Sequence, residues 1–372
     1  MAKLGEVCKL NMGQSPDSSS YNDTGDGIPF FQGNADFGEV HPNIRVWCNA
    51  PTKIAHPGEI LISVRAPIGA MNIADCECCI GRGLASISAD EAVCTTKYLW
   101  YGISSKIEEL NAKGTGSTFK AVNKKTLEET EIPIRDLMEQ ERIAAKLDSV
   151  TALITLRKRQ VKKLDELIKA RFVEMFGDPV SNPLNWPTAE LGKRCEIITG
   201  NTPSRAEPEN YGTFIEWIKS DNINTPSTFL TEAQERLSEI GFQKCRFVES
   251  GSLLMTCIAG SLNCIGNVAV ANRRVAFNQQ INAITPTHDN VLYLYWLMIL
   301  SKPTIHRTIN MALKGILSKS QLSSIKFPFP PLPLQNQFAA FVERVDKQKQ
   351  TVQQSLEKLE LMKKALMQEY FG

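Results

Sequence analysis

The chain contains two copies of one unit, and this repeat constrains its fold more than any other feature. Leu4-Gly5 near the start recurs as Leu191-Gly192, and Phe176-Gly177 recurs as Phe371-Gly372 at the other end. A unit of about 185 residues that is present twice is typical of a duplicated domain and not of a short-period solenoid. We therefore expect two similar halves that share one order of elements.

Each copy divides into a strand-rich part and a helical part. Short alternating or apolar runs that follow glycine, as at 58–64 and 251–256, predict strands and turns. Two further stretches, 96–110 and 289–301, predict helices among these strands. The first two-thirds of each copy is therefore predicted to be a mixed α/β (α+β) globular domain with a mainly β core.

The last third of each copy predicts one long helix. Apolar residues alternate steps of four and three, and the second copy keeps the phase of the first. Proline and glycine are missing from 143–175 and 338–370, so each helix is expected to extend for about 50 Å. The seam positions are Ile143, Leu147, Val150, Ile154, Arg157, Val161, Leu164, Ile168, Arg171 and Met175 in the first copy, and Phe338, Val342, Val345, Lys349, Val352, Leu356, Leu359, Lys363, Leu366 and Tyr370 in the second.

A long helix with a single apolar seam needs a partner, and the other copy offers a helix with the same spacing. The alternative is a pair of ordinary amphipathic helices that pack on separate domains. The remaining faces of both helices are too polar to be surrounded by a core, which disfavours this alternative. We therefore expect the two helices to pair with each other as a coiled coil.

Composition indicates a folded chain without a membrane segment. Hydrophobic residues make up 42% of the 372 residues, which favours buried cores over a disordered chain. The N-terminus becomes polar at once, and the longest apolar run, 291–300, has about half the length of a bilayer span. We expect a cytoplasmic protein that does not enter a membrane.

The ten cysteines are expected to be reduced thiols, because they are spread thinly along a chain that lacks a secretory leader. Cys76, Cys78 and Cys79 form the one cluster. A zinc site would need a second pair of ligands, whereas the four histidines stand singly. Buried strand thiols are therefore favoured over zinc binding.

The sequence motifs of common enzyme classes are missing. The chain has no G-x-x-x-x-G-K-[ST] loop, no G-x-G-x-x-G, no H-E-x-x-H and no G-x-S-x-G. It also lacks the Asn/Asp-Pro-Pro-aromatic loop of the amino-methyltransferases. We therefore expect that this chain alone is not an enzyme.

Three groups of short motifs occur in order along the whole chain. Leu4-Gly5-Glu6 with Gly13 opens the first copy, and Leu191-Gly192 with 200–203 opens the second. The domains end at 132–134, followed by 139–143, and at 327–335. A linker at 176–183 separates the copies. In this combination the chain resembles the specificity subunits of type I restriction–modification systems.

The resemblance implies two target recognition domains, at 1–136 and 179–330, each followed by a long helix, at 137–178 and 331–372. In this family the two helices pack antiparallel as a spacer. The first copy lacks the proline-rich step that precedes the second helix, which blurs its boundary by a few residues.

The resemblance also implies a subunit without a catalytic centre and without a cofactor of its own. Its partners would be double-stranded DNA, two copies of a modification subunit that use S-adenosylmethionine to methylate adenine, and motor/nuclease subunits that cleave unmodified DNA. Two domains at the ends of a rigid spacer can read two short sites about 34 Å apart. Because the two copies differ in sequence, the half-sites are expected to differ as well.

The charge of the chain predicts weak DNA binding in isolation. Residues 1–136 carry 13 basic and 17 acidic residues, and residues 179–330 carry 14 and 11. Strong free-standing DNA-binding proteins have a clearer basic excess. We expect partner subunits to supply much of the phosphate contact.

Loops rich in amide and basic side chains are the candidate DNA contacts. Arginine reads guanine and amides read adenine in the major groove, while lysine suits phosphate. Any one of these residues can instead cap a turn or face solvent, and Asn123 and Ser318 are predicted helix N-caps. The candidates are Gln14, Ser15, Gln32, Asn34, Arg65, Arg82, Lys113, Ser117 and Lys120 in the first copy, and Thr202, Ser204, Arg205, Lys219, Asn222, Asn278, Gln279, Gln280 and Lys314 in the second.

A second function from another class is a coiled-coil scaffold whose globular heads bind proteins without DNA specificity. Co-purification with a methyltransferase subunit would distinguish the DNA-specificity role from this scaffold.

Overall fold

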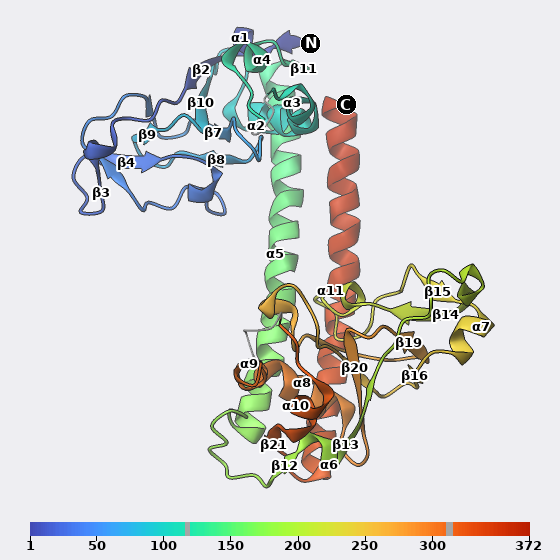
Figure 1. The fold of residues 1–372 in the computed structure, drawn as a ribbon. Coiled ribbons are helices and arrows are strands. Elements are labelled where there is room, and N and C mark those ends of the chain that lie inside the picture. Colours follow the sequence, from blue (N-terminus) through green and yellow to red (C-terminus); the bar gives the residue numbers. More distant parts are fainter. Residues whose placement is uncertain (116–119, 310–314) are drawn as a thin grey trace. The chain divides into compact units, whose positions relative to one another are not determined.

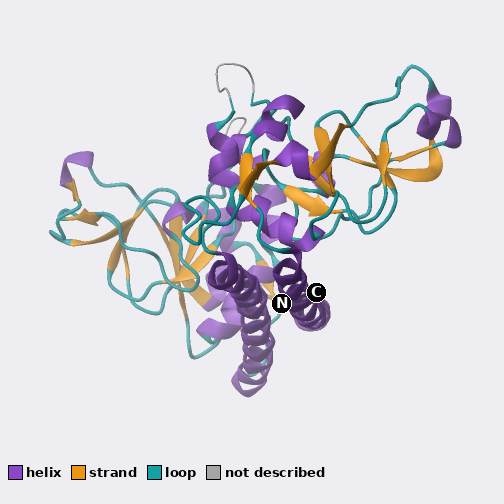
Figure 2. Cartoon of the chain, turned by 90° about the horizontal axis from the view of Figure 1, so that it is seen from below, coloured by secondary structure: helices purple, strands orange, loops and turns teal. Residues whose placement is uncertain are grey.

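The structure, a computed structural model, describes residues 1–115, 120–309 and 315–372 and divides into two compact units (Figure 1). The first unit contains residues 1–158 and 354–372, and the second contains residues 159–353. Each unit therefore contains one strand-rich domain and a part of both long helices. Figure 2 shows the strands, in orange, connected largely by loops.

The first unit contains two sheets of several strands and one short pair. One sheet is antiparallel, and the other contains a parallel pairing of β4 with β9. The sheets have the strand orders β2 (Cys8–Met12), β10 (Leu84–Ala89), β7 (Ile60–Ser63), β8 (Met71–Ile73), and β3 (Tyr21–Asn22), β5 (Trp47–Cys48), β4 (Ile28–Phe31), β9 (Cys78–Ile80), β6 (Ile54–Ala55), with β1 (Ala2–Lys3) paired to β11 (Glu131–Ile132).

Short helices accompany these sheets in the first unit. They are α1 (Leu4–Val7), α2 (Thr96–Ser105), α3 (Ile107–Lys113) and α4 (Lys124–Glu128), with 3-10 turns η1 (Ser18–Ser20) and η2 (Asn34–Asp36). The prediction of one helix over 96–110 is wrong in one respect, because the backbone breaks at Lys106. A second helix starts after the break and buries Leu110 completely in the core.

The second unit repeats the topology of the main sheet, while its other sheet has four described strands in place of five. Its main sheet has the equivalent strand order, and β14 pairs in parallel with β19 as β4 does with β9. The orders are β13 (Cys195–Thr199), β20 (Ile281–Pro286), β17 (Leu253–Thr256), β18 (Val268–Val270), and β15 (Arg236–Leu237), β14 (Tyr211–Ile218), β19 (Val275–Phe277), β16 (Phe247–Val248), with β12 (Thr188–Glu190) paired to β21 (Lys326–Pro328).

The helices of the second unit extend the match between the copies, with one additional short helix at 239–243 among the described residues. They are α6 (Leu191–Arg194), α7 (Glu239–Gln243), α8 (Val291–Leu300), α9 (Lys302–Arg307) and α10 (Lys319–Ser324), with 3-10 turns η3 (Pro208–Asn210), η4 (Ser220–Asn222) and η5 (Leu262–Cys264). The predicted strands at 58–64 and 251–256 and the helix at 289–301 are confirmed within a few residues. The expected α/β fold with two similar β-rich domains is therefore confirmed.

The two long helices, α5 (Leu137–Phe176) and α11 (Leu332–Phe371), contain 40 residues each. All twenty predicted seam positions are buried or half-buried, so the predicted periodicity is confirmed. At about 1.5 Å per residue each helix is about 60 Å long, somewhat longer than the seam alone predicts.

Within each unit the two helices pair antiparallel. In the first unit Lys146 donates to the Tyr370 hydroxyl at 3.0 Å, and Lys158 lies 3.0 Å from Glu360. In the second unit Lys349 lies 2.7 Å from Asp165. The lower the residue number on α5, the higher the number of its partner on α11, which confirms the expected antiparallel pairing of the helices.

A buried glutamine ties the first turn of each long helix to the domain before it. Gln140 accepts a hydrogen bond from the Thr95 amide and donates to the carbonyls of Val93 and Arg135, at 2.8–2.9 Å. Gln335, its repeat equivalent, accepts from the amide of Asn290 in the same way. Both side chains are fully buried, so the helix and the domain meet at a packed, hydrogen-bonded joint in each copy.

The cysteines are free thiols, and several lie in the cores. Cys78 and Cys79 are fully buried on β9, which confirms the prediction of strand thiols, and burial raises the pKa of Cys78 to about 12. Cys76 precedes the strand and is half-buried. Within the described ranges, no helix is long and apolar enough to cross a membrane, and no group of His, Cys, Asp and Glu is arranged to hold a metal ion.

Candidate nucleic-acid interface

The candidate loops of the first unit meet where several strands of its sheets end. The Gln14 amide donates to the Ile80 carbonyl at 3.0 Å, which joins the loop after β2 to the loop after β9. The Val64 amide donates to the Gly83 carbonyl at 2.9 Å, and the Ala66 amide donates to the Lys120 carbonyl at 3.1 Å. These bonds bring the segments that carry Gln14, Arg65, Arg82 and Lys120 side by side.

A repeated glycine permits this close approach. A β-carbon on Gly13 would collide with the carbonyl oxygen of Gly81, and one on Gly200 would collide with that of Asn278. Neither oxygen belongs to a flexible side chain that could move away. The recurrence of this glycine in both copies therefore has a steric cause, which is close contact between two loop backbones.

The loop after β4 joins the same cluster. The Gln32 amide donates to Asp36 at 2.7 Å, and a β-carbon on Gly83 would collide with the Gln32 carbonyl oxygen. Asp36 is buried and also pairs with Arg45. We name the set of loops at 13–15, 32–34, 65–66, 81–83 and 113–120, as far as they are described, the first loop cluster.

The candidates of the first loop cluster differ in exposure. Gln14, Gln32, Arg65, Arg82, Lys113 and Lys120 are exposed, whereas Ser15 and Asn34 are half-buried. Lys113 pairs with Glu109 one helical turn away, at 2.6 Å, and the Ser15 hydroxyl accepts a bond from the Arg82 amide at 3.3 Å. Ser117 lies outside the described residues.

The second unit builds an equivalent cluster from the same strand ends. The Gly200 amide donates to the Ile281 carbonyl at 3.0 Å, the Asn278 amide to the Ile218 carbonyl at 3.0 Å, and the Cys257 amide to the Gln280 carbonyl at 2.8 Å. The candidates Thr202, Ser204, Arg205, Lys219, Asn222, Asn278, Gln279 and Gln280 lie on these loops, which we name the second loop cluster.

Two candidate amides of the second loop cluster are engaged within the protein. Asn278 is 7% exposed, and its side chain accepts from the Gln280 amide at 3.0 Å. Asn222 is 8% exposed, accepts from the Lys219 amide at 3.0 Å and donates to the Glu232 carbonyl at 3.2 Å. Both amides therefore shape their loops, whereas Gln279 and Gln280 are exposed.

The remaining candidates of this cluster are more open. Ser204 and Arg205 are exposed, and Thr202 and Lys219 are half-buried. Lys314 lies outside the described residues. The direct DNA contacts assigned to all of these residues stay predictions.

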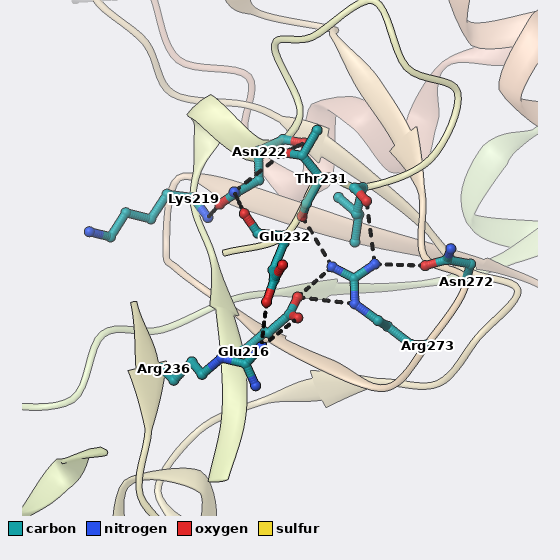
Figure 3. Close-up of polar contacts among 9 residues, drawn as sticks. Glu216, Lys219, Asn222, Thr231, Glu232, Arg236, Asn272 and Arg273 are labelled. Atoms are coloured by element: carbon teal, nitrogen blue, oxygen red, sulfur yellow. Dashed lines mark hydrogen bonds and ion pairs between the residues drawn. The ribbon is translucent and has the colours of Figure 1, made fainter. Parts of the chain in front are cut away.

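A charged network that sequence reasoning missed holds the loop between β14 and β15 (Figure 3). Glu216, on β14, is buried and lies 3.1 Å from Arg236 and 3.0 Å from the Nε atom of Arg273. Arg273 also donates to the carbonyls of Leu230 and Thr231, at 3.3 and 3.1 Å. No local spacing links these residues, because β15 and the segment before β19 reach Glu216 from distant parts of the chain.

Two cations of the second loop cluster share one carboxylate that sequence reasoning also missed. Arg205 lies 3.0 Å from Glu235, and Lys219 pairs with the same group. Burial acts to raise the pKa of Glu235, but the hydrogen bonds from Lys219 and Arg205 outweigh it and hold the pKa below its usual value. Glu235 is therefore ionised at neutral pH.

The first loop cluster does not carry charged side chains at the positions equivalent to Arg205 and Lys219 of the second loop cluster. Tyr21 and Tyr211 donate to the repeated prolines Pro16 and Pro203, at 2.8 and 3.0 Å, which aligns the two clusters. Two residues beyond these prolines stand Ser18 and Arg205. The residue that follows β4 is Gln32 and the one that follows β14 is Lys219. Similar scaffolds thus present different side chains.

The two predicted N-caps are confirmed. Asn123 accepts from the Thr126 amide at 2.9 Å at the start of α4, and Ser318 accepts from the Gln321 amide at 3.2 Å at the start of α10. These residues therefore have a structural role next to the loop clusters.

Comparison with known proteins matches both copies. The family model of the type I restriction modification DNA specificity domain matches residues 1–166 and 183–361. The putative type I restriction enzyme MjaX specificity subunit of Methanocaldococcus jannaschii is 42% identical over 161 residues, which are 43% of this chain and 38% of the relative. This match thus spans well under half of the relative's length.

Two longer matches extend over nearly the whole chain. The EcoBI specificity subunit of Escherichia coli is 20% identical over 380 residues, covering 92% of this chain and 77% of the relative. A crystal structure of the type I S subunit from M. genitalium covers 100% of this chain and 95% of its own, with a TM-score of 0.63 and 16% identity, which shows a shared fold. With both copies matched by the family model, the chain belongs to the family of type I restriction–modification DNA specificity proteins.

Proposed function

We propose that this chain is the specificity subunit of a type I restriction–modification complex and binds a bipartite DNA target. One observation carries the proposal: each of the two homologous domains gathers exposed arginine and amide side chains in a loop cluster at equivalent strand ends. Such side chains read base edges in the major groove, and clustered loop amides suit phosphate. Family membership supports the same role.

The two loop clusters support an asymmetric target. Arg82 in the first cluster is replaced by Gln279 in the second, while Gln32 is replaced by Lys219. Arginine pairs bidentately with guanine and glutamine with adenine. Each domain would therefore select its own short half-site.

The chain would act without a catalytic centre of its own. Separate modification subunits, in two copies, would bind S-adenosylmethionine and methylate adenine in both half-sites, and motor/nuclease subunits would cleave unmodified DNA. The role of this chain is then to bring the methyltransferases to the sequence that its two domains select.

A methyl-transfer assay tests this proposal. The purified full chain, mixed with S-adenosylmethionine and genomic DNA, should transfer no methyl groups until the modification subunit is added. With that subunit, sequencing of modified adenines should reveal one motif with two half-sites separated by an unspecified gap. Methyl transfer by the chain alone, or methylation without a bipartite motif, would contradict the proposal.

A further inference from the structure

The pair of cations in the second loop cluster rests on an aromatic platform. The guanidinium carbon of Arg205 lies 5.2 Å from the centre of the Tyr211 ring and 5.8 Å from that of Trp217. The Lys219 ammonium lies 5.4 Å from the centre of the Trp217 ring. Trp217 itself is 2% exposed, so its ring is fixed. The platform holds both cations in place before any ligand arrives.

The same cations remain accessible to a ligand. The side chain of Arg205 is 61% exposed and that of Lys219 is 34% exposed, whereas Glu235 is 26% exposed. Arg205 contacts both carboxylate oxygens, at 3.0 and 3.3 Å, in the two-pronged geometry that a phosphate also accepts. The Arg205 end of this ion pair is exposed to solvent, and such pairs contribute little net stability, so a phosphate can replace the carboxylate at Arg205.

The position of these two cations connects them to the proposed DNA-reading loops. The Trp217 indole donates to the Asn201 carbonyl at 3.3 Å, and Glu235 accepts at its carbonyl from the Trp217 amide at 3.1 Å. The adjoining Ile218 carbonyl accepts from Asn278. The two cations therefore border the loops that carry Thr202, Gln279 and Gln280, which are the proposed DNA-reading loops of this domain.

We propose that Arg205 and Lys219 form a phosphate-binding site for the DNA backbone, which the Glu235 carboxylate occupies until a backbone phosphate displaces it. The inference rests on the proposed function and assigns to Glu235 a role as a positioning residue. Because the carboxylate must leave before phosphate binds, Glu235 lowers the affinity of the second domain for DNA of any sequence. The first copy has Ser18 and Gln32 at the positions equivalent to Arg205 and Lys219. The displacement of a carboxylate by phosphate is therefore proposed for the second domain alone.

DNA-binding titrations of the full chain test the inference, with a fluorescein-labelled duplex of random sequence as the probe. Glu235→Gln should bind about threefold to tenfold more tightly than the unaltered chain at low salt, because two cations are released for phosphate. The slope of log affinity against log salt should steepen by about one. Glu235→Asp should retain the unaltered affinity within about twofold, since the charge is kept.

Glu249→Gln is the matched control. Glu249 lies 2.6 Å from Arg274, and Arg274 lies over the Phe247 ring, 5.5 Å from its centre. The Glu249–Arg274 pair lies next to the start of β19, whereas the second loop cluster lies next to the end of β19. The same change of net charge there should alter affinity by less than about twofold. In a chain that also carries Arg205→Gln and Lys219→Gln, Glu235→Gln should have no effect.

Each other outcome counts against the inference. Equal effects of Glu235→Gln and Glu249→Gln, or an effect of Glu235→Gln that persists without both cations, would overturn it and leave the proposed function intact. If Glu235→Gln fails to fold, Arg205→Gln and Lys219→Gln serve as the test. Each of these two variants should weaken DNA binding about threefold, and unchanged binding would overturn the inference. Absence of DNA binding by the unaltered chain at every salt concentration, alone and with its modification subunits, would overturn the proposed function and the inference together.

Discussion

At the scale of single residues, one carboxylate in the second unit is placed unfavourably. Asp346, on α11, is half-buried, and its Oδ2 atom accepts no hydrogen bond within the described part of the chain. Burial raises the pKa of Asp346 above its usual value, and nearby Asp165 adds to this effect while Lys349 opposes it. Folding thus disfavours the ionised form of Asp346. The neighbouring Lys349–Asp165 ion pair joins the two helices.

Replacing Asp346 should therefore stabilise the chain in a pH-dependent way. A raised folded-state pKa means that the cost is absent below the unfolded pKa, grows as the pH rises from the unfolded to the folded pKa, and is complete above the folded pKa. Asp346→Asn should unfold with about 1 kcal/mol more free energy at neutral pH and with little difference in acid. Urea unfolding at several pH values measures this, and Glu343→Gln, an exposed change on the same helix, should show no such trend. An equal pH trend in both variants would contradict the explanation.

At the scale of elements, the seam of each long helix is distinguished from its neighbouring faces by only a few residues. Leu164 packs against the core of the second unit, whereas Leu167, three residues further along α5, is 48% exposed. Both are leucines on one helix, so they share the same helix propensity. The two leucines differ in burial, because only Leu164 packs against α11 and the domain core.

A charge should therefore destabilise the chain at Leu164 and have little effect at Leu167. Leu164→Glu would place an uncompensated carboxylate in the seam and should lower the free energy of unfolding by about 2–4 kcal/mol. Leu167→Glu should change it by less than about 0.5 kcal/mol. Melting temperatures of the two full-length variants give the comparison, and Leu359→Glu with Leu361→Glu repeats it on α11, where Leu361 is 67% exposed. Equal stability of the members of a pair would mean that the seam is assigned to the wrong face.

At the scale of the whole molecule, the proposed function separates base selection from spacing. The loop clusters lie in the two domains, while α5 and α11 contain the periodic seam. A heptad keeps such a seam in phase and adds about 10 Å of helix, or about three base pairs of DNA at 3.4 Å each. Because α5 and α11 pair antiparallel within each unit, both helices need the insertion.

Seven residues inserted after Leu156 and seven after Glu360 should lengthen the unspecified gap of the methylated motif by about three base pairs. Both half-sites should stay the same, with lower activity because the DNA must rotate to follow the longer spacer. Sequencing of methylated adenines in cells that carry the altered chain and its modification subunit measures the motif.

Exchanging residues 1–136 for another domain of the family is the complementary control. It should change one half-site and leave both the gap and the other half-site unaltered. New bases in both half-sites after the exchange, or in either one after the insertion, would show that domains and spacer are not separable.

The sequence alone determined the duplication, the long helices and the type of most strands. These features depend on local spacing, because a 4-3 apolar period or an apolar run after glycine reports which face of a helix or strand must be buried. The recurrence of Gly13 as Gly200 and of Gln140 as Gln335 was visible as well. Their causes, a backbone contact and a buried joint, became clear only from the structure.

Tertiary structure alone decided which polar side chains meet. Glu235 reaches Arg205 across 30 residues, and Glu216 reaches Arg273 across 57, through the pairing of β14 with β15 and β19. The same strand order turns the amide of Asn278 inward. A strand carries no local signal of its neighbours in a sheet, because pairing depends on long-range hydrogen bonds and on burial shared by segments far apart in sequence. The candidate loops could therefore be named from the sequence. The carboxylate of Glu235, which forms ion pairs with two cations of these loops, could not.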